Sequence, residues 1–382
     1  MYSLLIKNGM LVDGISPKRR KADIAVENGR IAAIGVCGDE EAVSIVDAGG
    51  CLVTPGLIDH HAHLYPMAPA GIPAEAVCFA SGVTSAVDAG STGCDSFERY
   101  RPFMEQSKLG IQAYLNVCST GLASLPEPEN LDPEAFDRSR IRELFEQYPG
   151  ELLGLKIRIS RSIVGGAGLK PLQAASELAE ELAVPLMVHS TDPPENFKIL
   201  LSLLKPGDIV THMYHNTGFT ILDEEKRVQD AVWQARERGI LFEAADARAH
   251  FSFEVSEVAM REAFLPDFIA TDLTAFSMHL RPTSFNLAMQ ISKYCALGMS
   301  FEAVIRRCSA NPAKNMGIFE TAGSLETGKT ADIAVFKPIR QKTRFGDRVY
   351  GDPSEEFREG TILYQPVLTV KTGEMVYRDI TF

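Results

Sequence analysis

Residues 55–63 read Pro55-Gly56-Leu57-Ile58-Asp59-His60-His61-Ala62-His63, an apolar strand that ends in a cluster of histidines. Side chains at positions i and i+2 of a strand point to the same face, so His61 and His63 can both bind one metal ion. His60 has the opposite parity and is expected to face the covering helices. Imidazole is a common ligand of zinc and related divalent ions, so this segment predicts one end of a metal site.

Further strand candidates follow this segment at a mean spacing of about 30 residues, which is the length of a βα unit. Amphipathic helices separate them, and residues 171–183 and 223–238 each place their apolar side chains on one face. Several strands are apolar on both faces, as parallel strands covered by helices must be. The pattern predicts an α/β chain that folds as a closed (β/α)8 barrel. Its strands are expected at residues 57–63, 84–89, 111–117, 153–159, 185–189, 208–212, 240–245 and 268–272.

Both ends of the chain read as short β-strands without helices between them. Near the N-terminus, Asn28-Gly29 separates two apolar segments and is a strong hairpin signal. Such strands are too few and too short at either end to make an independent domain. We therefore predict that residues 1–54 and 321–382 combine into one small β-sandwich, while residues 55–320 form the catalytic barrel.

The C-terminal ends of the strands face the active site in a barrel of this kind. Those ends carry an unusual set of ligand-type side chains: His61, His63, Lys156, His189, His212 and Asp272. A carboxylate from Asp272 would complete the site begun by His61 and His63, and the other two histidines stand on consecutive strands and suit a second ion. We predict two divalent metal ions, zinc by preference, although the same donors also serve manganese, cobalt and iron.

Lys156 is an unfavourable neighbour for two cations while it is an ammonium. Burial beside them lowers its pKa toward the neutral amine, which can react with carbon dioxide to give a carbamate. The carbamate is anionic and has two oxygens that can bridge two metals. We therefore predict that Lys156 is N6-carboxylated.

The composition restricts the partners of the chain. Its 38 basic and 50 acidic side chains give a formal charge of −12, which argues against binding to nucleic acid or to an anionic membrane. We find neither an apolar run of roughly 18 residues, as a bilayer span requires, nor a signal peptide. The seven cysteines form no C-x-x-C pair, as expected of free thiols in a reducing compartment. We expect a cytoplasmic protein with a small-molecule substrate. A homo-oligomer is compatible with the sequence, which identifies no interface.

The histidine segment 55–63 resembles the signature of the amidohydrolase superfamily of metal-dependent hydrolases. The resemblance continues through the ligand-type strand ends, in the same order, and into the Gly-x-x-x-x-Gly-x-x-Ala-Asp stretch at residues 323–332, so it covers nearly the whole chain. Residues 87–91, 155–158 and 185–189 are similar to the dihydroorotase-like branch of amidohydrolases and deacetylases. Some members of that branch remove acetyl groups from small acylated hydroxy or amino acids.

This resemblance and the strand-end residues together predict an amide or ester hydrolase. Its substrate is expected to be a small amino- or hydroxy-acid-like molecule that carries an acyl group, such as acetyl. The nucleophile would be a hydroxide that bridges two metal ions. Asp272 is the expected catalytic residue, because it can take the proton of that hydroxide and deliver it to the leaving group.

Three alternatives remain beside this prediction. A cyclic-amide hydrolase of the dihydroorotase or hydantoinase type would use the same ligands. A deaminase with a single metal usually carries an acid such as glutamate shortly after the strand-5 histidine, where this chain has Ser190-Thr191-Asp192, and it has no use for Lys156. A non-catalytic scaffold would be favoured by the loss of ligands, and none is lost.

The loop after the seventh expected strand departs from the branch. A Gly-His-Gly type of turn is expected there, whereas residues 245–250 read Ala-Asp-Ala-Arg-Ala-His. Asp246 aligns with the missing histidine, and another histidine follows four residues later. We expect substrate contacts from this loop and from one further arginine, namely Asp246, Arg248, His250 and Arg281.

Overall fold

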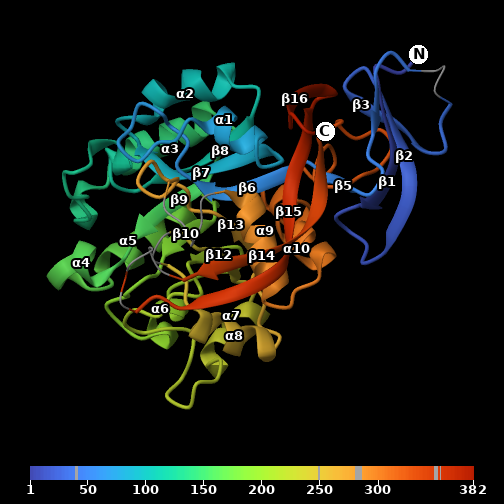
Figure 1. Ribbon diagram of the computed structural model, residues 1–382. Helices are drawn as coiled ribbons and strands as arrows, with labels where there is room; N and C mark the ends of the chain where they lie inside the picture. The colour runs from blue at the N-terminus through green and yellow to red at the C-terminus, as the bar shows by residue number, and fades with distance from the viewer. Residues whose placement is uncertain (39–41, 248–249, 280–285, 348–351, 353) are drawn as a thin grey trace.

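The computed structural model describes residues 1–38, 42–247, 250–279, 286–347, 352 and 354–382 (Figure 1). Two sheets organise these residues, an eight-stranded parallel sheet and an eight-stranded mixed sheet. The predicted (β/α)8 barrel is confirmed, and the part predicted as a small β-sandwich is confirmed as a separate sheet that strands from both termini build together. No helix in the described part of the chain has the length and apolar character that crossing a bilayer requires.

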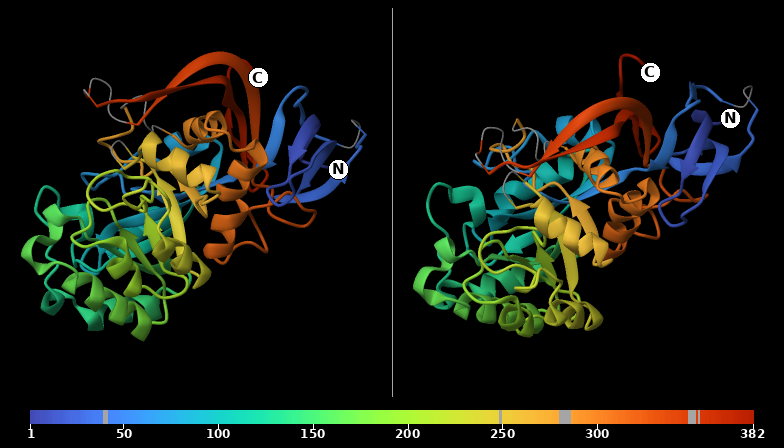
Figure 2. Two further views of the ribbon diagram at one scale, coloured as in Figure 1. Left: turned by 90° about the horizontal axis from the view of Figure 1, so that it is seen from below. Right: turned by 60° about the horizontal axis from the view of Figure 1, so that its bottom comes forward.

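The parallel sheet follows chain order, so that each barrel strand pairs with the strands before and after it. Its strands are β6 (Leu57–Ala62), β7 (Val83–Gly93), β8 (Gly110–Asn116), β9 (Leu152–Arg158), β10 (Leu186–His189), β11 (Ile209–Thr211), β12 (Leu241–Ala245) and β13 (Phe268–Ala270). Each overlaps a predicted strand. The helices cover the outside of this sheet (Figure 2), and the main apolar core lies between them and the strands.

The helices of the described residues are short; most lie between successive barrel strands, and the last three follow β13. They are α1 (Ala74–Phe79), α2 (Phe97–Gln106), α3 (Arg138–Gln147), α4 (Arg161–Val164), α5 (Lys170–Glu181), α6 (Phe197–Ser202), α7 (Asp230–Glu237), α8 (Phe253–Arg261), α9 (Leu287–Ala296), α10 (Phe301–Arg307) and α11 (Ala310–Asn315). The predicted helix over residues 171–183 corresponds to α5. The predicted helix over residues 223–238 is wrong in its first half, because Asp223 and Arg227 bond to each other across a tight turn and α7 starts only at Asp230.

The barrel closes where its first strand meets the end of its last strand. Both carboxylate oxygens of Asp59 accept hydrogen bonds from Thr271, one from its backbone N–H at 3.0 Å and one from its hydroxyl at 2.7 Å. The backbone N–H of Asp272 donates to the carbonyl of His61 at 2.7 Å, and that of His63 donates to Leu273 at 2.9 Å. Closure therefore places Asp272 directly beside the two histidines of the opening segment.

The second sheet combines strands from the two ends of the chain. Its members are β1 (Leu4–Val12), β2 (Arg19–Glu27), β3 (Arg30–Gly35), β4 (Ile45–Asp47), β5 (Leu52–Pro55), β14 (Ile333–Gly346), β15 (Phe357–Lys371) and β16 (Glu374–Arg378). β5 pairs with β1 on one side and with β14 on the other, so the N-terminal and C-terminal strands form one continuous sheet (Figure 1). This sheet has an apolar core of its own.

A single residue, Gly56, separates β5 of the second sheet from β6 of the barrel. A Cβ atom at this position would lie 2.2 Å from the Thr84 hydroxyl, so a side chain does not fit. The backbone N–H of Gly56 donates to the carbonyl of Asp332 at 2.8 Å. The two sheets are thus joined rigidly, directly before the histidine segment.

The carboxylate of Asp332 ties this junction to the C-terminal strands. It accepts from the Lys371 ammonium at 2.7 Å and from the backbone N–H of Thr372 at 2.8 Å, and the residue is buried. The aspartate that closes the Gly-x-x-x-x-Gly-x-x-Ala-Asp stretch therefore contributes to the fold and does not line the pocket described below.

We predict that Asp332→Ala lowers the free energy of unfolding by about 1–3 kcal/mol, because the substitution removes the buried carboxylate that Lys371 and the Thr372 N–H share as their acceptor. Urea denaturation measures this effect, with Glu180→Ala on the exposed side of α5 as the control that changes little. An unchanged denaturation midpoint for Asp332→Ala would show that the carboxylate does not hold the junction.

Candidate metal centre

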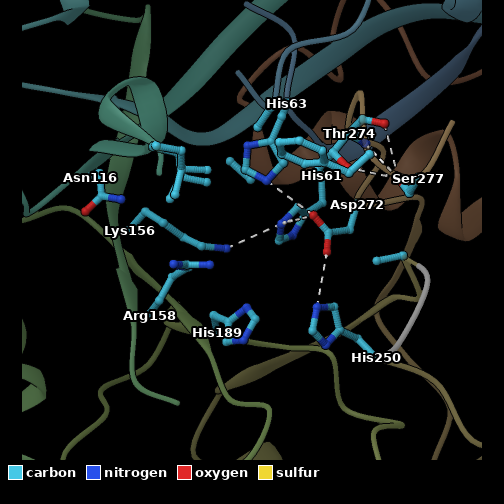
Figure 3. A pocket seen from close by; sticks show the side chains of 16 residues that line it. His61, His63, Asn116, Lys156, Arg158, His189, His250, Asp272, Thr274 and Ser277 are labelled. Carbon is cyan, nitrogen blue, oxygen red and sulfur yellow. Dashed lines mark hydrogen bonds and ion pairs between the residues drawn. The ribbon is translucent and has the colours of Figure 1, made fainter. Parts of the chain in front are cut away.

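The predicted metal ligands gather around one pocket at the C-terminal ends of the barrel strands (Figure 3). The pocket is lined by His61, His63, Lys156, His189 and Asp272. His212 is buried beside them, with its ring centroid 5.2 Å from that of His61 and 4.4 Å from that of His189. The fold thus brings the six side chains together, and the roles assigned to them stay predictions.

His61, His63 and Asp272 form the first half of this centre. The Nε2 atoms of the two histidines lie 3.4 and 3.3 Å from Oδ1 of Asp272. Nδ1 of His63 donates to the Ser91 hydroxyl at 2.9 Å, and Ser91 donates in turn to the Asp88 carboxylate at 2.7 Å. A proton on Nδ1 leaves the lone pair on Nε2, which is the tautomer that can bind a metal ion from the pocket.

Glu243 on β12 holds His61 in the same way. One carboxylate oxygen accepts from Nδ1 of His61 at 2.7 Å, and the other accepts from Nδ1 of His60 at 2.6 Å. The side chain is fully buried. Burial alone would raise the pKa of Glu243, but its electrostatic interaction with His61 and the hydrogen bonds from both histidines outweigh burial and hold that pKa well below its usual range. Glu243 is thus a buried carboxylate that orients a predicted ligand.

His60 does not face the covering helices as its parity predicted. It is fully buried inside the barrel, where its ring stacks on Phe268 and its Nε2 atom lies 2.9 Å from Oδ1 of Asn315. The physical reason is a register shift between Asp59 and Ala62 in the pairing of β6 with β7. Such an irregularity interrupts the alternation of faces, so adjacent histidines can reach the same carboxylate.

Lys156 extends from β9 into the pocket, and its side chain is closely packed along its length. Its Nζ atom lies 3.4 Å from Nε2 of His61, and its side chain is buried. A Cβ atom at Gly90 would lie 2.6 Å from Cγ of Lys156, so the glycine makes room for the lysine stem. Burial lowers the pKa of Lys156 to about 8, and the nearby acids Asp272 and Glu243 oppose a larger shift. A larger fraction of Lys156 is therefore in the neutral amine form than of an exposed lysine at the same pH.

His189 and His212 form the second half of the centre. Nε2 of His189 lies 3.1 Å from the Ser160 hydroxyl, and Nδ1 of His212 donates to the carbonyl of Ala245 at 2.7 Å. Burial and the neighbouring imidazoles hold the pKa of both rings well below the usual range, so they are neutral as metal ligands must be. Nε2 of His212 is buried and has no hydrogen-bond partner among the residues that the structure describes, and a metal ion would supply one. The donors of the pocket therefore fit divalent metal ions.

The four residues expected to contact the substrate lie in different places. His250 lines the pocket, and its Nε2 atom lies 3.9 Å from Oδ2 of Asp272. Asp246 does not line it, which corrects the prediction. Its carboxylate is buried in an ion pair with Lys293 and accepts from the Tyr294 hydroxyl at 2.9 Å. Arg248 and Arg281 lie outside the described residues.

Arg158 is a pocket residue that we did not single out from the sequence. It stands two residues after Lys156 on β9 and lines the pocket together with Lys156 (Figure 3). Its Nε atom donates to the buried carboxylate of Glu129 at 2.6 Å, and Glu129 also accepts from Asn116 at 3.0 Å. The i, i+2 rule applied to Lys156 would have identified this arginine.

We predict that Glu243→Gln weakens metal binding by about 10- to 100-fold. The carboxylate accepts one hydrogen bond from His61 and one from His60, whereas an amide has only one oxygen to accept them. Titration of the metal-free protein against a competing chelator measures the loss. Glu257→Gln, which changes a partly exposed ion pair with Arg358, is the matched control and should leave the affinity unchanged. Equal affinities for both variants would contradict the role given to Glu243.

Comparison with known proteins agrees with this geometry. The model of the amidohydrolase family matches residues 52–376. A deacetylase of Agrobacterium fabrum (strain C58 / ATCC 33970) is 33% identical over 318 residues, which cover 81% of this chain and 76% of the relative. The crystal structure of an adenine deaminase has a TM-score of 0.88 at 27% identity and covers 99% of this chain and 100% of its own. That of a dihydroorotase has a TM-score of 0.86 at 29% identity and covers 99% and 98%. The chain therefore belongs to the amidohydrolase family of hydrolases.

Proposed function

We propose that the protein is a two-metal hydrolase that removes an acyl group, an acetyl group above all, from a small amino- or hydroxy-acid-like molecule. The observation that carries this proposal is the convergence of two histidine pairs, Lys156 and Asp272 on one pocket. The likeness to a deacetylase over most of both chains supports the acyl group.

Two divalent ions, zinc in our proposal, would occupy the two halves of the centre. His61, His63 and Asp272 would hold one ion, and His189 and His212 the other. Lys156 would bridge them as its N6-carboxylated form, which its burial and its closeness to His61 support. When bound, such ions polarise a substrate carbonyl and lower the pKa of a water molecule.

Asp272 would act as the proton carrier of the reaction. Burial alone would raise the pKa of Asp272, but its electrostatic interaction with His61 and the hydrogen bond from His63 hold that pKa well below the usual range, so the group starts as a carboxylate. Oδ1 lies against the first histidine pair, while Oδ2 is 3.9 Å from Nε2 of His212. In our proposal Oδ2 accepts the proton of the attacking water and passes it to the leaving nitrogen or oxygen.

The rest of the pocket provides contacts suited to an acylated acid. Arg158 brings a guanidinium that can pair with a carboxylate. Leu122, Leu125 and Phe276 form an apolar wall for a side chain. We propose that this charged and apolar combination orients the substrate, while the centre supplies the hydrolytic chemistry.

Two other reactions are tested alongside deacylation. The structural likeness to a dihydroorotase favours a cyclic amide as the second candidate. The likeness to an adenine deaminase is the observation in favour of an amino-substituted heterocycle, although a single-metal deaminase gives Lys156 no role. A panel of acetylated amino and hydroxy acids, dihydroorotate, hydantoins and adenine separates the three, and we expect turnover of the acetylated acids. Turnover of adenine alone would contradict the proposal.

We predict that Asp272→Asn lowers kcat/KM by about 10²- to 10⁴-fold, because the amide cannot carry the proton. The metal content should stay nearly constant, since the histidines of both halves remain. Steady-state kinetics and elemental analysis of the same preparation test this. Full activity in the variant would refute the role of Asp272, and metal loss equal to the loss of activity would reduce it to a ligand.

A further inference from the structure

The imidazole of His250 lies beside the rings of His189 and His212, the second histidine pair of the centre. Its ring centroid is 4.4 Å from that of His212 and 5.0 Å from that of His189. One ligand atom of each of the three rings lies within 4.8 Å of the corresponding atom of the other two. Figure 3 shows His250 on the same side of the pocket as His189.

Each of these rings has one nitrogen engaged by the surrounding chain. The Ser160 hydroxyl lies at Nε2 of His189, the Ala245 carbonyl at Nδ1 of His212, and the Thr191 hydroxyl at Nδ1 of His250, the last at 2.9 Å. The second nitrogen of each ring is the one that a metal ion could take, and in His212 and His250 this nitrogen lies 3.9 Å from Oδ2 of Asp272. Outer contacts of this kind orient the histidine ligands of metal sites.

Backbone hydrogen bonds hold Ala247 and His250 in place. The backbone N–H of His250 donates to the carbonyl of Asp246 at 3.1 Å, and that of Ala247 donates to Thr271 at 2.9 Å. The Asp246 side chain is held by Lys293 and Tyr294 in the core. The aspartate at the position where the branch has a histidine therefore fixes a loop that brings an imidazole in from position 250.

We propose that His250 is a third imidazole ligand of the metal ion held by His189 and His212. Three histidines are a sufficient protein ligand set for a zinc ion with an open fourth position. The second half of the centre would then hold its ion with side chains alone, whether or not Lys156 is carboxylated. The proposal rests on metal occupancy of the proposed centre and not on the identity of the substrate.

The test compares His250→Ala with His279→Ala, which removes an exposed histidine from another loop. Metal-free wild type and variants are titrated with Zn2+ against a chromophoric chelator and with Co2+ under visible absorption. We expect His250→Ala to weaken the binding of one equivalent by at least about 10-fold and to change the Co2+ spectrum, while His279→Ala does neither. Thr191→Val, which removes only the hydroxyl at Nδ1, should weaken the same equivalent less.

Several outcomes would overturn the proposal. An unchanged affinity and Co2+ spectrum in His250→Ala would do so, and a fall in kcat/KM with unchanged metal binding would make His250 a substrate contact instead. Equal thermal unfolding of the metal-free variant and wild type shows that lost binding is not lost folding. If wild type takes up only one ion, the two-metal function fails separately, and the comparison still decides whether His250 binds that ion.

Discussion

Asp59 joins the first barrel strand to the end of the last by accepting two hydrogen bonds from Thr271. The same closure lets the backbone N–H of Asp272 reach the carbonyl of His61. Residues more than two hundred positions apart in the chain thus meet at one point of the pocket. The geometry of the first half of the centre depends on this closure, and the second half follows from the parallel order of the strands between.

The orientation of the histidines depends on partners from other strands and loops. Glu243, Ser91, Ser160 and Ala245 each contact one ring nitrogen of a predicted ligand. In the proposed centre these contacts would orient the rings before a metal ion binds, so that binding would need little reorganisation. Buried imidazole nitrogens need a partner, and Nε2 of His212 has no hydrogen bond within the described part of the chain.

The barrel and the six strand-end ligands could be predicted because apolar strands recur at regular intervals and parallel strands deliver their ends to one face. Four features could not be predicted from the sequence. The face of His60 depends on a register shift, and the role of Glu243 depends on which histidines its strand meets. Asp246 belongs to the core because Lys293, on a distant helix, supplies its countercharge. The start of the helix predicted at 223–238 was missed because a local turn competes with the helix.

The bridging role of Lys156 is the central claim, and metal content per chain tests it most directly. Elemental analysis would compare wild type with Lys156→Ala, both purified without chelators. The account predicts about two ions per chain in wild type and a sharp fall in the variant, because alanine cannot form the proposed carbamate. One ion per chain in both proteins would contradict the bridge and move the single-metal deaminase into first place.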